Sequence, residues 1–304
     1  SLVGSEMCIR DRISTFDYYK KDKLFSRNDK PSFNSKDERF VKLMVALPFL
    51  ANKRAEFSLG YGQLEDNYFQ SSVIDFDKDR SDRSTYKLLG GSIGFYGSTL
   101  NTRQYATKGY LEKLIAQVFT GRERFEPGNP QEGYSPSPQE RQSWLQISYM
   151  KEAYHTMGPK FTLGWMAEAL YSSKNFSENY TATMMQAGEF APTPHSKLMY
   201  NEAFRANQYV AAGIKPIYVL NDMFQFRTEF YGFTPIFPIK KNALNKAYYG
   251  KAFSRFEYMG EVSVICHLPF GAISAYVNHY SSPRREWNVG MTIGWQLFNY
   301  RFVE

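Results

Sequence analysis

The pentapeptide Gly90–Gly94 matches G-x-S-x-G, a pattern that carries the nucleophilic serine of many ester hydrolases. The serine acts there on a sharp strand-to-helix turn, which exposes its hydroxyl group. In this chain large side chains such as Leu89, Ile93 and Phe95 alternate with small ones straight through the pattern, and no helical pattern follows. We therefore expect a strand here and assign no catalytic residue. An esterase that uses Ser92 remains a lower-ranked alternative.

The histidines and cysteines lack the spacing of a metal site. Cys8 and Cys266 form no C-x-x-C pair, and Cys266 adjoins His267, which is poor spacing for two ligands of one metal. No histidine belongs to a pattern such as H-E-x-x-H. We expect neither a metal nor a cofactor, and we expect each histidine to be a satisfied interfacial or loop residue. The four histidines are His155, His195, His267 and His279.

The net charge of +7 comes from scattered lysines and arginines. No basic helix or nucleic-acid motif accompanies this charge, so nucleic acid is not expected as a partner. Anionic lipid head groups around a membrane barrel fit the charge better, and a solvated loop surface explains it most simply. Aromatic residues make up 17% of the chain, yet the mean hydropathy is −0.49. This combination suits a barrel with aromatic girdles and a polar interior, and also an aromatic-rich soluble β protein.

The strand pattern is clearest in the last stretch of the chain, Trp287–Phe302. Large apolar residues occupy every second position there, and small or polar residues occupy the positions between them. A period of two is the period of a β-strand, because successive side chains leave opposite faces. A strand of this length is typical of a tilted membrane-spanning strand, which needs about 9–11 residues. The apolar positions are Trp287, Val289, Met291, Ile293, Trp295 and Leu297.

Similar alternation predicts eleven strands in all, or twelve with Ile13–Lys21. The connections between them are short and long by turns, which is typical of outer-membrane barrels. The weakest strand is Lys108–Thr120, which also fits a helical face but is needed to keep that order. Charged residues such as Arg227 and Glu229 lie mid-strand opposite the aromatics, where a polar lumen would accept them. The sequence therefore predicts an all-β fold, an antiparallel transmembrane β-barrel. The long connections span residues 66–85, 121–142, 172–208 and 233–250.

Residues Ser1–Arg12 do not look native to the chain. Their sequence, SLVGSEMCIRDR, resembles translated sequencing-adapter sequence at the ends of gene fragments. We exclude them from the fold as an artefactual leader. The barrel domain is then expected over residues 13–304.

Five stretches match one known family. The chain resembles the C-terminal barrel of bacterial patatin-like phospholipases, which belongs to the outer-membrane surface-antigen, or assembly-factor, superfamily. The likeness extends over nearly everything after Arg12 and is most specific in the second half. It implies the bacterial outer membrane as the location and outer-membrane lipids as partners. The matching stretches are Asn179–Thr183, Pro192–Lys197, Asn201–Ala212, Tyr248–Phe253 and Leu297–Glu304.

The resemblance implies a barrel of sixteen strands whose long sixth outer loop folds into the lumen. Five strands follow that loop in the family, and five predicted strands follow Ser172–Gln208 here. The chain is then the C-terminal part of such a barrel, with about 11–12 of its strands. The upstream patatin domain with its Ser-Asp dyad is expected to be missing, and the chain contains no Asp-Gly dipeptide. An incomplete barrel should show an open sheet edge, or a strained smaller closure, near Phe40 and Trp287.

By this resemblance the chain is a non-catalytic barrel module. It would anchor or translocate an upstream lipid acyl hydrolase, the patatin domain of the parent protein. An assembly or translocation factor, or a porin, without any lipase domain is the alternative from another class.

The resemblance also implies a contact between the sixth loop and the lumen wall. Superfamily members carry an arginine at the tip of this loop that reaches a carboxylate on the second strand after it. Arg205 lies where that arginine belongs, although the Arg-Gly-aromatic pattern is altered here to Arg-Ala-Asn. Glu229 is the matching carboxylate and falls on the inward face by parity. We expect Arg205 and Glu229 to form a latch that holds the loop inside.

Overall fold

A computed structural model describes residues 2–16, 33–70, 80–129, 141–198, 200–268, 271–281, 287–294 and 303. Its main feature is one antiparallel sheet of twelve strands, in which each strand pairs with the next long strand of the chain. The strands are β1 (Leu2–Phe16), β2 (Phe33–Leu50), β3 (Lys53–Tyr68), β4 (Asp82–Ser98), β5 (Gly109–Glu126), β6 (Arg141–Thr156), β7 (Phe161–Ser172), β10 (Gln208–Val219), β11 (Phe224–Pro235), β14 (Glu257–Leu268), β15 (Gly271–Tyr280) and β16 (Trp287–Gly294).

The two faces of the sheet differ because side chains alternate along every strand. On β3, Leu59 and Tyr61 are more than half exposed, whereas Leu64 and Tyr68, on the other face, are buried. Along β16 Val289 is 76% exposed, whereas Asn288 and Gly290, on the other face, are half-buried. A continuous exposed apolar face is what a barrel presents to lipid, and the predicted parity of the strands is confirmed.

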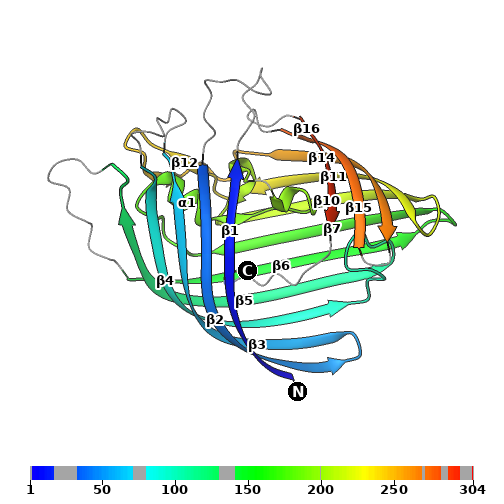
Figure 1. Ribbon diagram of the computed structural model, residues 1–304, viewed down its shortest axis with the longest axis horizontal. Coiled ribbons are helices and arrows are strands. Elements are labelled where there is room, and N and C mark those ends of the chain that lie inside the picture. The colour runs from blue at the N-terminus through cyan, green and yellow to red at the C-terminus, as the bar shows by residue number, and fades with distance from the viewer. Residues whose placement is uncertain are drawn as a thin grey trace.

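The sheet curls around a loop that occupies its inner side (Figure 1). This loop carries the short helix α1 (Tyr180–Gln186), the strand pair β8 (Gly188–Glu189) and β9 (Arg205–Ala206), and two 3-10 turns, Ser196–Leu198 and Glu202–Phe204. A small hairpin, β12 (Ile239–Lys241) with β13 (Ala247–Tyr249), rises from the next long connection. No helix that the structure describes is long and apolar enough to cross a membrane.

Each of the eleven predicted strands from Phe40–Leu50 onward corresponds to a strand of the sheet, in the predicted order. The possible first strand, Ile13–Lys21, overlaps β1 at residues 13–16, and residues 17–21 lie outside the described residues. The ambiguous segment Lys108–Thr120 is a strand, because β5 pairs along its length with β4 and β6. The sheet is open, with β1 and β16 at its two edges. The predicted edge near Trp287 is therefore correct. The edge near Phe40 is one strand off, because β2 pairs with β1 rather than ending the sheet.

The strand β1 runs through residues 2–12, which the sequence prediction excluded from the fold. It pairs with β2 from Leu2 to Phe16, with a register shift between Arg10 and Ile13. The structure thus assigns a strand to this segment, and its foreign origin stays a prediction. At the other end, β16 is described as far as Gly294, and the rest of the predicted strand, residues 295–302, lies outside the described residues.

Candidate functional site: the loop folded against the inner face

The helix α1 holds the first part of the long loop, residues 173–207 between β7 and β10, against the sheet. Asn179 caps this helix, since its side chain accepts a hydrogen bond from the Ala182 amide. The same side chain donates to the Tyr68 hydroxyl of β3 at 2.7 Å. Ala182 and Met185 pack against Tyr68 in a buried cluster. One asparagine therefore both starts the helix and fixes it to the inner face of the sheet.

Aromatic packing holds the middle of the loop. The rings of Phe190 and Phe233 stack with centroids 5.8 Å apart. The centroid of the Phe204 ring lies 5.6 Å from that of Phe233. Tyr209 and Tyr280 complete the contact from the inner faces of β10 and β15. These side chains belong to the largest buried apolar cluster of the described residues. Because these side chains are buried together, the loop is packed against the inner face of the sheet. This agrees with the predicted inward fold of the loop.

Arg205 lies at the centre of the loop with its side chain 10% exposed, and its partner is Glu189. The guanidinium and the carboxylate are 2.9 Å apart, and the two residues are directly opposite in the β8–β9 pair. The other guanidinium nitrogen donates to the carbonyl oxygens of Met184, Met185 and Ala187, at 3.4, 3.1 and 3.3 Å. Carbonyls at a helix C-terminus lack helical partners, so Arg205 satisfies the end of α1. Burial alone would lower the pKa of Arg205, but Glu189 raises it instead.

Glu229 has a different partner from the predicted one. Its carboxylate lies 2.8 Å from the guanidinium of Arg227, and Tyr231 donates to its other oxygen at 2.8 Å. Arg227 and Tyr231 are two positions away on the same strand and face, so they reach Glu229 without any movement of the loop. The predicted pairing of Arg205 with Glu229 is therefore wrong in its partner. Arg205 does lie on the inner side of the sheet, as expected, but its bonds join two parts of the same loop.

His195 makes the contact with the lumen wall that Arg205 was expected to make. Its ring is completely buried and stacks on Tyr276, with centroids 3.6 Å apart. Nδ1 lies 2.8 Å from Glu261 on β14, and Nε2 lies 3.0 Å from the Ser274 hydroxyl on β15. Nε2 also lies 3.2 Å from the Thr292 hydroxyl on β16. One loop residue thus binds side chains from three neighbouring strands.

Ser274, His195 and Glu261 have the bonding order of a hydrolytic triad. Glu261 also accepts hydrogen bonds from Thr193 and Asn278, which hold it in place. Ser274, however, is only 1% exposed, and its hydroxyl group is already bonded to Tyr105 and Thr292. A nucleophile needs an open face for its substrate, and this one is enclosed on every described side. The arrangement therefore acts as an anchor for the loop.

The anchor also brings together two connections that leave the sheet at opposite ends of its strands. Tyr105 lies in the connection between β4 and β5, at the end opposite to the long loop, and adopts a positive φ of 53°. Its hydroxyl lies 3.4 Å from Nε2 of His195. Gln225 and Arg227 on β11 donate to the carbonyl oxygens of Tyr105 and Ala106. Both connections thus bend inward and meet at His195.

A buried cation occupies the first part of the loop. The ammonium group of Lys174 lies 4.7 Å from the centroid of the Tyr86 ring and 4.9 Å from that of Trp144. It donates to Gln186 at the end of α1. Burial lowers the pKa of Lys174 to about 8, and the nearby Glu123 limits the fall. Docking of the loop should therefore depend on the protonation of Lys174 in the alkaline range.

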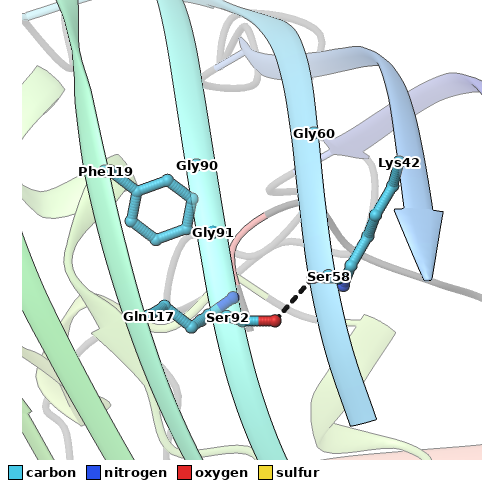
Figure 2. A pocket seen from close by; sticks show the side chains of 8 residues that line it. All are labelled: Lys42, Ser58, Gly60, Gly90, Gly91, Ser92, Gln117 and Phe119. Atoms are coloured by element: carbon cyan, nitrogen blue, oxygen red, sulfur yellow. Dashed lines mark hydrogen bonds between the residues drawn. The ribbon is translucent and has the colours of Figure 1, made fainter. Parts of the chain in front are cut away.

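Ser92 lies on the straight strand β4, so the G-x-S-x-G pattern forms no nucleophile elbow. Its hydroxyl bonds to that of Ser58 at 2.6 Å, as Figure 2 shows. The two serines border a hollow of about 10 Å³, about the volume that holds one water molecule. Lys42 is the one charged residue among those that line it. No group of three or more His, Cys, Asp or Glu side chains in the described part of the chain is arranged to hold a metal ion.

The sequence pattern indicated the loop but not its partners. The expectation that His195 is satisfied is confirmed, yet its role as the contact to three strands was not foreseen. Glu189 was not considered, because a two-residue strand gives no periodic signal. The spacing Thr193-Pro194-His195-Ser196 could have suggested a built turn, since Thr193 and Ser196 bond to each other through their side chains.

Comparison with known proteins supports the fold. No family model and no curated protein matches the chain. Among solved structures, it is similar to BamA from Haemophilus ducreyi lacking POTRA domains 1–3, with a TM-score of 0.53 and 13% identity. The match covers 95% of this chain and 57% of that one. The fold is that of an outer-membrane β-barrel.

Two autotransporter domains are also similar. The transport unit of AIDA-I from Escherichia coli has a TM-score of 0.37 and 10% identity, over 86% of this chain and 82% of that one. The translocator domain of NalP from Neisseria meningitidis has a TM-score of 0.35 and 8% identity, over 83% and 77%. Scores this low add nothing to the argument. The BamA-like fold and the exposed apolar face together support the predicted location in the bacterial outer membrane.

Proposed function

We propose that the chain is the non-catalytic outer-membrane β-barrel module of a patatin-like phospholipase. In this proposal it anchors or translocates an upstream lipid acyl hydrolase domain. The supporting observation is that the residues behind the family resemblance build the inward loop. Asn179 caps α1, His195 binds three strands, and Arg205 closes the loop on Glu189.

The test is the sequence of the gene upstream of this segment. We expect a G-x-S-x-G pattern in a strand–turn–helix context, together with an Asp-Gly dipeptide, as a patatin domain requires. Repeated small α/β modules without that pattern would instead identify an assembly factor and overturn the proposal. Hydrolysis of phospholipid by membranes that carry the full-length protein, lost when the upstream serine is changed to alanine, would establish the activity.

A further inference from the structure

Four cations form a line across the outer face of β2 to β6. The register pairs Arg39 with Gln63, Gln63 with Lys87, Lys87 with Arg122, and Arg122 with Arg141. All four cations are exposed. We call Arg39, Lys87, Arg122 and Arg141 the basic row. Neighbouring strands are about 4.8 Å apart, so the row extends for about four such intervals.

The basic row borders the apolar outer face. The next outward-facing residues, two positions away from Arg39, Gln63 and Lys87 towards the short connections, are about half exposed. They are Val41, Tyr61 and Leu89. The next outward positions include Leu59 and Val118, each 58% exposed. Two residues along a strand correspond to about 7 Å. If the apolar face lies in hydrocarbon, the basic row lies at the depth of the lipid head groups, on the side of the long connections.

The cations of the row have no carboxylate partner among the described residues. Arg141 donates to the Thr120 hydroxyl, and no ion pair involves any of the four. Other arginines of the same strands and face are paired: Arg83 lies 3.3 Å from Glu65, and Arg124 lies 2.8 Å from Glu126. Like charges directly opposite on neighbouring strands repel. The row therefore leaves a positive charge that an anion outside the protein would neutralise.

We propose that the basic row binds the phosphate groups of anionic lipids in the membrane leaflet beside the long connections. Arginine suits this role, because its planar fork can bind two phosphate oxygens at once. Adjacent cations such as Lys87 and Arg122 are close enough to share one phosphate. The acyl chains of the same lipid would then lie on Leu89 and Val118. A lipid rather than a free anion is the ligand, because the row is exposed and continuous with an apolar surface.

The test is lipid retention by the full chain in a neutral detergent, measured by native mass spectrometry with phosphatidic acid and phosphatidylcholine as probes. The wild type should retain phosphatidic acid in preference. A variant with Arg39→Gln, Lys87→Gln, Arg122→Gln and Arg141→Gln should lose at least about tenfold in affinity for it, since each cation near a lipid surface contributes severalfold. The matched control, Arg83→Gln with Arg124→Gln, removes two paired arginines and should keep the preference.

Three results would overturn the proposal. They are equal retention of the two lipids by the wild type, unchanged retention by the fourfold variant, and displacement of phosphatidic acid by millimolar inorganic phosphate, which would assign the row to free anions. The double variant Arg122→Gln with Arg141→Gln guards against misfolding. It removes a repulsive pair, so it should fold at least as well as the wild type and still lose much of the preference.

Discussion

The buried ion pairs of Arg205 and Glu229 are made with partners that lie close in register or in the chain. Glu189 is directly opposite Arg205 in a two-residue strand pair, and Arg227 is two positions from Glu229 on one face. The predicted latch required Arg205 to prefer a carboxylate that already has a nearer cation. Burying a charge is costly unless it is paired, and Glu189 and Glu229 each pair with a cation close at hand. Short-range pairs therefore form here in place of the long-range one.

Removing Arg205 should release the loop. Arg205→Ala removes the ion pair to Glu189 and the donor to the last carbonyl groups of α1, a loss that costs roughly 3–5 kcal/mol where a pair is fully buried. Limited proteolysis of the refolded protein should then cut within residues 173–207, where the wild type resists.

The two carboxylates distinguish the observed pair from the predicted latch. Glu189→Gln should raise cleavage of the loop nearly as much as Arg205→Ala does. Glu229→Gln should disturb Arg227 instead and leave the loop protected. Release of the loop by Glu229→Gln alone would show that the predicted latch is the one that operates.

Neither candidate serine should act as a nucleophile. Ser92 is bonded to Ser58 on a straight strand, and Ser274 is enclosed in the His195 anchor. Ser92→Ala and Ser274→Ala should each leave any hydrolysis of a short-chain p-nitrophenyl ester unchanged from the wild type. A large loss in a variant that still folds would make that serine catalytic.

Among the structural elements, the strands could be predicted from the sequence and the interior of the long loop could not. Alternation is a local signal with a period of two, and the exposed face of the sheet repeats it on every strand. β5, where Leu111, Leu114 and Ile115 also fit a helix, was predicted from the strand order that its neighbours require. The loop has no such period. Its shape depends on single contacts such as His195 with Glu261, which join residues 66 positions apart.

The strand faces predict how the sheet tolerates charge. Leu43 and Met44 are neighbours on β2 that point to opposite faces. Leu43→Arg would place a charge in lipid, at a cost of about 2–4 kcal/mol near the middle of a bilayer. Met44→Arg faces the inner side and should cost much less. Urea unfolding in lipid vesicles measures the difference, and equal effects would argue against the assigned faces.

Docking of the loop should strengthen with rising pH through Lys174. Its pKa is lowered to about 8 in the folded loop, against 10.5 for an ordinary lysine. Between these values the released loop binds more protons than the docked loop, so docking gains free energy as pH rises. Cleavage of residues 173–207 by a protease active across this range should fall between pH 8 and 9.5, after correction for the enzyme's own pH profile. Lys174→Met should remove the trend; an unchanged trend would assign it to another group.

As a whole, the molecule is an open sheet with a packed interior. The edges β1 and β16 are each paired on one side, whereas the inner face is filled by the loop and by the inward turn at Tyr105. Alternation predicted the strands, and the family resemblance implied that the barrel is incomplete. The filling of its interior from both ends was not predicted, because it depends on contacts between segments far apart in the chain.

A membrane-spanning sheet must have its outer face in contact with lipid. The most direct test is a single-cysteine series on β3 in a background without Cys8 and Cys266, labelled with an environment-sensitive dye in vesicles of nitroxide-bearing lipid. Labels at Phe57, Leu59 and Tyr61 should be quenched, and labels at Glu56 and Ser58 should not, because the two sets lie on opposite faces. Quenching without this alternation, or a chain that stays monomeric in buffer without detergent or lipid, would contradict the account.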